Sequence, residues 1–252
     1  MSYERDGHIV RITLRRPERL NAIDAAVNRE LVEAVERLDA DGEARVAILA
    51  GEGRAFCAGA DLGAVAEGGG EALGDATDSF AGFVSMPRAK PVVAAVHGYA
   101  LAGGLELALA CDVVVAAAGT WFGLPEVTRG LVAAAGGAIR LPRLVPEKRA
   151  LEIILTGRRF DAAEALSLGL VSRVVPAGKL DGAARELADA IAANAPAAVR
   201  ESLALVRATR GMTEAQAWGH SAAAWRSVLT TDDAHEGARA FLERREPRWS
   251  GA

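Results

Sequence analysis

A long, mostly apolar stretch occupies the centre of the chain, from position 91 to 119. It begins with β-branched valines at 92–96 and breaks at His97-Gly98. It continues through the pair Gly103-Gly104 into a helix-like segment and ends on a second valine-rich run, Val113–Val115. Apolar runs without alternation are typical of elements that are buried on all sides. The pattern therefore predicts a buried strand, a loop, a buried helix and a second buried strand.

On the N-terminal side of this stretch, the pattern predicts a hairpin, a helix and a strand. Apolar residues alternate with polar ones within Ser2–Leu14, and Asp6-Gly7 supplies a tight turn, as in a β-hairpin. Asp24 is suited to cap a helix that has apolar residues on one face and ends at Gly42. The short apolar run Val46–Ala50 predicts a buried strand.

On the C-terminal side, the pattern predicts one more strand and then helices alone. The glycine-rich segment 120–145 is expected to form loops. Helical periodicity and N-caps predict helices Glu147–Leu155 and Asp161–Leu168, a strand Leu170–Val174, and helices Asp181–Ala193, Ala197–Thr209, Glu214–Leu229 and Ala234–Arg245. Because the strands stop near Val175, we expect an α/β body followed by a helical tail. The segment Ala64–Ser85 lacks periodicity and is either a mobile segment beside the site or a plain surface loop.

Composition and charge exclude several classes of protein. The chain has 252 residues, 51% hydrophobic and 25% charged, enough to bury a large core. The formal net charge of −4 gives no reason to expect nucleic acid or an anionic membrane as a partner. Two cysteines are too few for a disulfide framework, and nothing near them has zinc-ligand spacing. The N-terminus lacks the apolar core of a secretory leader, and charged residues interrupt the central stretch, so we expect a soluble, cytoplasmic protein.

Two glycine-containing segments could place backbone N–H groups around a ligand oxygen. They are residues 58–61 (Ala-Gly-Ala-Asp) and 102–104 (Ala-Gly-Gly), and each follows a predicted strand and precedes a helix start. Converging N–H groups at helix N-termini stabilise negative charge. A dinucleotide-binding GxGxxG motif at Gly51 is rejected because Phe56 stands where its third glycine should be. Glycine pairs also form simple turns, so these segments alone leave the function open.

Two carboxylates lie close to these segments in the sequence. Glu106 interrupts the apolar helix that follows Gly103-Gly104, and Glu126 follows Pro125, whose ring fixes the local backbone. Such a pair could share general acid and base duties if burial raises a pKa. The alternatives are a buried Glu106 paired with an arginine and a solvated Glu126 in a loop. Spacing alone does not decide between these interpretations.

Several further motifs occur in order along nearly the whole chain. The most specific are AFCAGADL at 55–62, HGYALAGGLELALACD at 97–112 and FGLPEV at 122–127. The others are RPERLNAID at 16–24, GGAIRLPR at 136–143, LTGRRFDAAEALSLGLVSRVV at 155–175 and DDAHEGARAFLERREPRW at 232–249. Together they resemble the crotonase superfamily, the enoyl-CoA hydratase/isomerase family.

The resemblance implies a fold and an assembly. The expected fold is α/β, with a crotonase-like repeated ββα spiral core over residues 1–195 that carries the acyl-CoA site. A C-terminal helical region over residues 196–252 would mediate self-association as a homotrimer or a hexamer. The implied partner is an acyl-CoA thioester, and neither nucleic acid nor a membrane is expected.

The resemblance also implies the site. The thioester oxygen would lie in an oxyanion hole made by the backbone N–H groups of Ala60 and Gly103, with Glu106 and Glu126 as catalytic residues. The positions that match the family's substrate-binding and coenzyme A-binding residues are Ala22, Ala58, Ala60, Asp61, Leu62, Gly103, Phe241 and Arg244. The last two would reach the coenzyme A of a neighbouring subunit. No metal and no separate cofactor are implied, because coenzyme A is part of the substrate.

The implied reaction is reversible syn addition of water across the C2=C3 double bond of a 2-enoyl-CoA, as in an enoyl-CoA hydratase, a hydro-lyase. Glu106 would deprotonate the water that attacks C3, and Glu126 would deliver a proton to C2. Family members with other reactions have often replaced one or both glutamates, so the joint presence of the two favours hydration. The alternative is an enoyl-CoA isomerase, for which one carboxylate would suffice.

The chain departs from the usual hydratase pattern near the expected acyl pocket. It has GGAIRLPR where well-studied hydratases tend toward GG-Thr-Gln-Arg, and Ala133–Ala135 and Trp121 also alter this region. The variation resembles branches that act on less usual acyl groups, including carnitinyl-CoA or other hydroxyacyl-CoA dehydratases. A remote alternative is an acyl-CoA-binding member without turnover. The acyl group therefore stays open.

Overall fold

The structure, a computed structural model, describes residues 1–64 and 81–251. Its centre is a six-stranded sheet in the order β1-β2-β3-β4-β6-β9, formed by β1 Ser2–Asp6, β2 Ile9–Leu14, β3 Val46–Gly51, β4 Val92–Val96, β6 Val113–Ala117 and β9 Arg173–Val175. β1 and β2 form the predicted hairpin, and the other neighbouring strands are parallel. Parallel strands are usually covered on both faces, which explains why β4 and β6 show no polar alternation.

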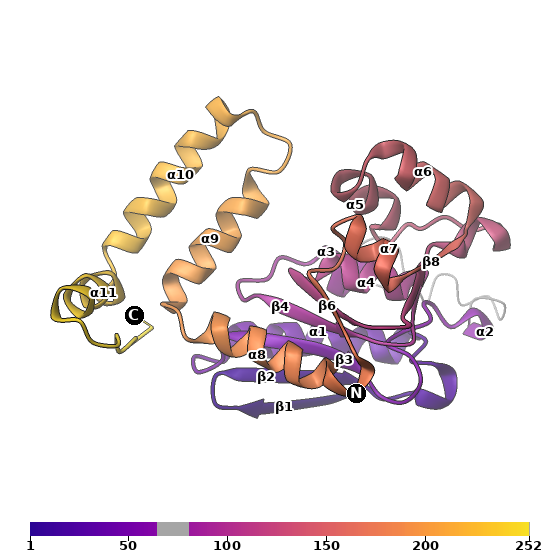
Figure 1. The fold of residues 1–252 in the computed structure, drawn as a ribbon, viewed down its shortest axis with the longest axis horizontal. Coiled ribbons are helices and arrows are strands. Elements are labelled where there is room, and N and C mark those ends of the chain that lie inside the picture. The colour runs from indigo at the N-terminus through magenta and orange to yellow at the C-terminus, as the bar shows by residue number, and fades with distance from the viewer. Residues whose placement is uncertain (65–80, 252) are drawn as a thin grey trace.

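Side chains of the sheet point into two hydrophobic cores, one on each face. Ile48 of β3 belongs to the core that includes helix α8 (Leu180–Ala192). Its neighbour Leu49 points to the other face and belongs to the core that includes α1 (Ala25–Ala40) and α4 (Gly103–Ala110). Figure 1 shows α8 against one side of the sheet, with α4 among the helices on the other. The sheet thus holds α4 in a fully buried layer.

A second, three-stranded sheet lies beside α4 and corrects the sequence prediction. β7 (Trp121–Gly123) pairs in parallel with β5 (Tyr99–Leu101) and antiparallel with β8 (Arg159–Asp161). The loops predicted over 120–145 are therefore partly wrong, because this segment contains β7 and the helix α5 (Gly137–Leu144). Strands of three residues are too short to show a period of two, so the pattern could not reveal them.

The body also contains two longer helices and several short helical segments. They are α6 Glu147–Thr156 and α7 Ala162–Ser167, with short helical segments α2 Leu62–Ala64, α3 Ala81–Ser85, η1 Pro17–Arg19, η3 Pro125–Arg129 and η4 Ala177–Lys179. The carboxylates of Asp24 and Asp161 accept the N–H groups of Val27 at 2.9 Å and Glu164 at 2.8 Å, so both predicted N-caps are confirmed. The segment interpreted as mobile or as a plain loop lies, from residue 65 to 80, outside the described residues.

Three C-terminal helices extend away from this body (Figure 1). They are α9 Pro196–Ala208, α10 Glu214–Leu229 and α11 Asp232–Glu243, each within about two residues of its predicted bounds at either end. No residue of α10 is buried, and its side chains Trp218 and Trp225 are 63% and 64% exposed. Arg207 of α9 ties this region to the body through an ion pair of 2.6 Å with Asp112.

Candidate functional site

The predicted N–H donors of Ala60 and Gly103 lie on two segments that contact each other. The N–H of Leu101 donates to the carbonyl oxygen of Cys57 at 3.1 Å, which joins the segment before α4 to the segment after β3. A Cβ atom added to Gly59 would lie only 3.1 Å from the backbone nitrogen of Gly103. The two predicted halves of the oxyanion hole are therefore adjacent in space.

Among the described residues, neither N–H group has an acceptor, so both could bind a ligand oxygen. The N–H of Ile23 donates to the carbonyl oxygen of Gly59 at 2.8 Å, and the N–H of Asp61 donates to the carbonyl oxygen of Ile23 at 2.9 Å. These bonds do not involve the N–H of Ala60. Gly103 is the first residue of α4, so its N–H has no acceptor within the helix. Neither N–H donates to any other residue in the described part of the chain. Two unpaired donors at a helix N-terminus suit a polarised carbonyl or an oxyanion.

Glu106 lies one turn into α4, where all eight residues are buried. Its side chain is 3% exposed, and its Oε1 accepts the N–H of Gly137 at 2.8 Å. Burial raises the pKa of Glu106 to about 7; the Gly137 N–H opposes the rise, and the charge of Glu126 adds to it. Over residues 1–64 and 81–251, no arginine forms a salt bridge with Glu106, although the charge of Arg140 lowers its pKa slightly. The sequence reasoning did not single out Gly137, which lies within the motif GGAIRLPR.

Glu126 is the second residue of η3 and is 8% exposed. Within the described residues, neither of its carboxylate oxygens has a hydrogen-bond partner. Burial raises the pKa of Glu126, opposed by the dipole of its own backbone N–H and by the charge of Arg129. The alternative of a solvated loop acid is therefore wrong. The charge of Glu126 contributes to the raised pKa of Glu106. The two carboxyl groups are therefore close enough to interact electrostatically.

The residues predicted to bind coenzyme A in the N-terminal part occupy two neighbouring segments, with Ala22 in one and Ala58, Ala60, Asp61 and Leu62 in the other. The Arg16 guanidinium joins these segments, donating to the carbonyl oxygen of Ala22 at 2.7 Å and to Asp61 at 3.1 Å. The buried Asn21 side chain adds hydrogen bonds to the carbonyl oxygens of Ala55 and Glu52, at 2.7 and 2.9 Å. Sequence reasoning did not identify Arg16 or Asn21 as residues that hold this site, although both lie within the motif RPERLNAID.

The structure does not bring Phe241 and Arg244 to this site within one chain. Phe241 is 83% exposed near the end of α11, and Arg244 caps that helix in the left-handed conformation, with φ of 54°. Figure 1 places α11 at the opposite end of the molecule from α2 and β8. Their contact with a bound coenzyme A stays a prediction that depends on a second copy of the chain.

The fold and the site define an enzyme class in which two N–H donors polarise a carbonyl beside two buried carboxyl groups. The sequence profile described as "Enoyl-CoA hydratase/isomerase" matches residues 4–252. The chain therefore belongs to the enoyl-CoA hydratase/isomerase family, as its motifs predicted.

Individual relatives agree with this assignment. The chain is similar to a carnitinyl-CoA dehydratase of Citrobacter koseri, 42% identical over 100% of this chain and 98% of the relative. A carnitinyl-CoA dehydratase of Salmonella enteritidis is 43% identical over 98% and 97%. Among solved structures, an enoyl-CoA hydratase from Mycobacterium tuberculosis H37Rv superposes with a TM-score of 0.94 at 45% identity, covering 100% and 98% of the two chains. The predicted α/β crotonase fold with C-terminal helices and the membership of an enzyme family of hydro-lyases are confirmed.

No group of three or more His, Cys, Asp or Glu side chains in residues 1–64 and 81–251 could hold a metal ion. Over the same residues, no helix combines the length and the apolar character that crossing a membrane requires.

The raised pKa of Glu106 predicts a pH-dependent stability. The folded protein binds a proton at Glu106 more tightly than the unfolded chain does, because the pKa rises from 4.5 to about 7 on folding. The stability that this group contributes is thus present below pH 4.5 and is lost as the pH rises through about 7. Replacing Glu106 by Gln removes the titration. We expect the free energy of unfolding of Glu106→Gln, relative to the parent protein, to increase by up to about 3 kcal/mol between pH 4 and pH 8.

Urea unfolding of both proteins across this pH range measures the difference. Glu147→Gln is the matched control, because Glu147 is exposed at the start of α6 and should leave the pH dependence of the parent protein unchanged. A difference between Glu106→Gln and the parent that does not vary with pH would contradict the prediction.

Proposed function

We propose that the protein catalyses the reversible syn addition of water to the C2=C3 double bond of a 2-enoyl-CoA thioester. The observation that carries this proposal is the juxtaposition of two buried carboxyl groups, Glu106 and Glu126, with the free N–H groups of Ala60 and Gly103. The family and its solved members are enoyl-CoA hydratases or isomerases by description, which supports an acyl-CoA substrate.

The geometry suggests a division of labour among these groups. The two N–H groups bind the thioester oxygen and stabilise enolate-like charge on it, and losing one such donor costs about 3 kcal/mol. Ionised Glu106 takes a proton from the water whose oxygen bonds to C3. Protonated Glu126 gives its proton to C2, and the two carboxyl groups then re-equilibrate with solvent. A pKa of about 7 lets Glu106 take up and release a proton near neutral pH, as a general base must. Burial also raises the pKa of Glu126, which favours its protonated form relative to an exposed glutamate.

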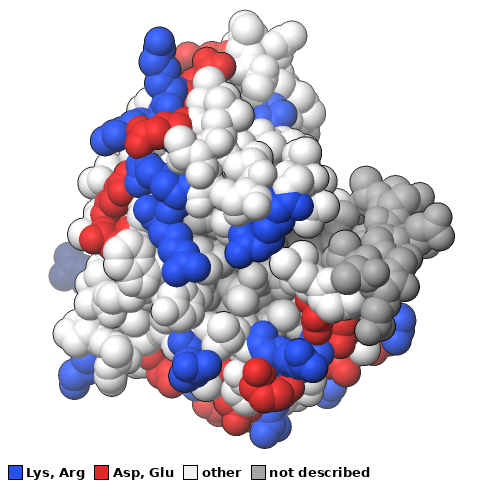
Figure 2. Space-filling model, turned by 90° about the vertical axis from the view of Figure 1, so that its right-hand side faces the viewer, with Lys and Arg blue, Asp and Glu red and all other residues white. Residues whose placement is uncertain are grey.

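The remaining surface is compatible with a coenzyme A ester. Ala22, Ala58, Asp61 and Leu62 lie beside Ala60 and would hold the coenzyme A moiety, and Arg16 fixes them. Figure 2 shows the face that carries α6, α7 and β8 in Figure 1, with a hollow that has Lys and Arg side chains above and below it. Such cations attract the phosphates of coenzyme A. The reaction proceeds with no resident cofactor and no metal ion, since the N–H groups and the carboxyl groups supply its polarisation and proton transfers.

The relatives support a second candidate substrate for the same chemistry. Proteins 42% and 43% identical over nearly the whole chain are named carnitinyl-CoA dehydratase, which indicates dehydration of a hydroxyacyl-CoA with a polar acyl group. Ala133 is buried and packs beside Gly137, which also contacts Glu106. The unusual residues Ala133–Ala135 therefore lie where they can alter the acyl site. Crotonyl-CoA and carnitinyl-CoA are the two substrates to compare.

Substitution of either glutamate should remove the activity. With crotonyl-CoA and carnitinyl-CoA as substrates, we expect Glu106→Gln and Glu126→Gln each to lower kcat by about 10²- to 10⁴-fold, because each loses one proton-transfer group. The measurement is the change in enoyl-thioester absorbance, with coenzyme A ester binding followed separately. Glu147→Gln should retain full activity.

Full activity in either active-site variant would contradict the two-glutamate mechanism. Loss of activity in only one of them would favour double-bond isomerisation. Binding of several coenzyme A esters without any turnover would support a non-catalytic binding protein.

We further propose that residues 196–252 form a self-association region, distinct from the core at 1–195, and that the protein is a homotrimer or a hexamer. Trp218, Trp225 and Leu229 follow one stripe of α10 and are 63%, 64% and 45% exposed. Large apolar side chains gathered on an exposed face typically mark an interface. In such an assembly Phe241 and Arg244, which one chain leaves exposed or at a helix end, would contact the coenzyme A of a neighbour.

Charge placed on this stripe should dissociate the assembly. We expect Trp218→Glu combined with Trp225→Glu to reduce the mass measured by light scattering from a multiple of 26.2 kDa to 26.2 kDa, because desolvating two carboxylates opposes association. His220→Glu is the matched control, since His220 lies on α10 away from the stripe and should leave the mass unchanged. A parent protein of 26.2 kDa would contradict the proposal.

A further inference from the structure

The two carboxyl groups of the site are held in different ways. The Glu106 carboxylate accepts a hydrogen bond of 2.8 Å from Gly137, which fixes its orientation directly. The Glu126 carboxylate has no such bond within the described residues, although it is buried. The position of this carboxylate is therefore set by the backbone of η3 and by the residues that pack against η3.

η3 rests on the turn Thr156–Arg158, which joins α6 to β8. Gly157 caps α6 in the left-handed conformation, with φ of 63°. A Cβ atom at Gly157 would lie 2.8 Å from Cγ2 of Thr128 and 3.2 Å from Cα of Pro125, the two residues of η3 that flank Glu126-Val127. Because the turn and η3 are packed this closely, a displacement of the turn would also displace η3.

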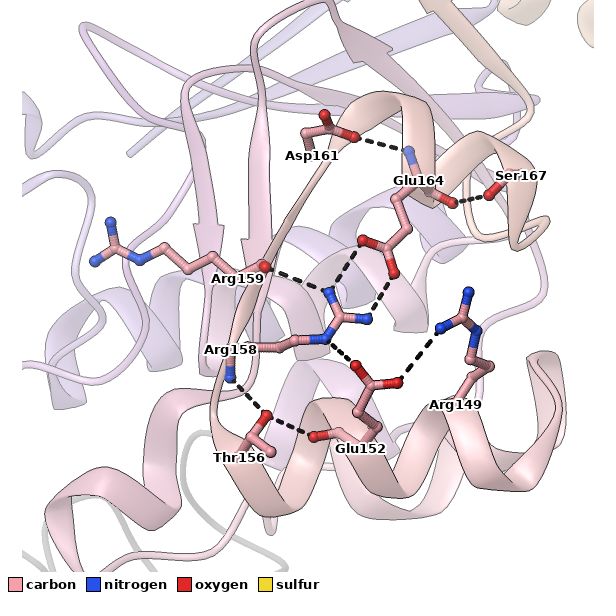
Figure 3. Close-up of polar contacts among 8 residues, drawn as sticks. All are labelled: Arg149, Glu152, Thr156, Arg158, Arg159, Asp161, Glu164 and Ser167. Atoms are coloured by element: carbon pink, nitrogen blue, oxygen red, sulfur yellow. Dashed lines mark hydrogen bonds and ion pairs between the residues drawn. The ribbon is translucent and has the colours of Figure 1, made fainter.

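The side chain of Arg158 holds this turn between two helices (Figure 3). It donates to both carboxylate oxygens of Glu164 on α7, at 2.6 and 3.0 Å, and to Oε1 of Glu152 on α6, at 2.8 Å. Thr156 completes the arrangement, because its hydroxyl donates to the carbonyl oxygen of Glu152 at 2.6 Å and accepts the N–H of Arg158 at 3.3 Å. A bidentate guanidinium–carboxylate pair fixes geometry as well as distance.

Stability alone does not account for this network. Arg158 and both of its carboxylate partners are partly exposed, and ion pairs in that setting contribute at most about 1 kcal/mol. Their arrangement instead restrains α6, β8 and α7 at a turn that packs against η3.

We propose that Arg158 is a positioning residue for Glu126: by joining Glu152 to Glu164, it fixes the turn on which η3 rests and so aims the Glu126 carboxyl into the site. This inference rests on the proposed function, in which Glu126 transfers the proton to C2. Arg158 itself does not touch the reacting atoms.

The test is a set of variants with a matched control. Arg158→Met and Glu164→Gln break the network from its two sides, and Arg158→Lys keeps the charge with a smaller donor group. Arg149→Met removes a guanidinium that pairs with the same Glu152, at 3.4 Å, from the preceding turn of α6. We expect Arg158→Met and Glu164→Gln to lower kcat by about 10- to 100-fold with KM within about twofold of the parent value. Arg158→Lys should recover part of kcat, and Arg149→Met should match the parent.

A double-mutant cycle separates positioning from general damage. If Arg158 acts through Glu126, Arg158→Met should lower kcat in the parent and in Glu106→Gln, yet leave the residual rate of Glu126→Gln unchanged. An equal loss in the Glu126→Gln background, or a parent-like kcat in both network variants, would overturn the proposal.

A measurement on the free protein keeps this test independent of the reaction. The carboxyl ¹³C resonance of Glu126, assigned with Glu126→Gln, reports its titration. Since burial is the main cause of its raised pKa, a loosened η3 should let water in and lower that pKa in Arg158→Met but not in Arg149→Met. An unchanged Glu126 titration in Arg158→Met would refute the positioning role even if no substrate were turned over. An inert parent protein with a shifted titration would refute the hydration function alone.

Discussion

The close backbone approach between residues 57–60 and the start of α4 is the constraint on which the site depends. A Cβ atom at Gly104 would lie 2.0 Å from the carbonyl oxygen of Cys57, so only glycine permits the two segments to meet. That approach places the N–H groups of Ala60 and Gly103 on adjacent segments. The parallel strands β3 and β4 deliver both segments to the same edge of the sheet, where ligand sites of such sheets usually lie. The proposed oxyanion hole thus depends on how tightly the backbones pack.

The same tight packing determines the chemistry of the carboxyl groups. α4 is buried along its whole length, and a carboxylate there is costly unless it is stabilised or protonated. Gly137 supplies one hydrogen bond to Glu106, which leaves its pKa near 7 rather than at an extreme. Glu126 receives no equivalent bond from the described residues, so its environment depends on the support of η3. The two acids therefore differ in how firmly each is held: a hydrogen bond orients Glu106, whereas the backbone of η3 positions Glu126.

Local sequence patterns predicted the elements that carry a strong local signal. A few adjacent residues are enough to specify each of these features, which are the apolar runs of β4 and β6, the hairpin turn and the caps at Asp24 and Asp161. The structure confirms all of them. The three-residue strands β5, β7 and β8 escaped because they are too short to establish a period. The helix α5 escaped because it begins at a glycine pair and contains Pro142, both of which are typical of loops. The resemblance of the motifs identified both glutamates, but not the residues that hold them in position. Gly137 and Arg158 meet their partners only in the folded chain, and periodicity carries no information about contacts between distant segments.

α4 shows how one short element serves two requirements at once. Its N-terminus presents the free N–H of Gly103 and the positive end of the helix dipole to the expected position of the substrate oxygen. Its C-terminus carries the negative end, and there the buried guanidinium of Arg88 donates to the carbonyl oxygen of Ala110. Arg207 of α9 adds a second cation nearby through Asp112, which itself accepts the N–H of Val92 at 2.9 Å. Arg88 therefore satisfies a carbonyl group at the negative end of the dipole inside the core, while the first N–H of the helix, that of Gly103, faces the position proposed for the developing charge.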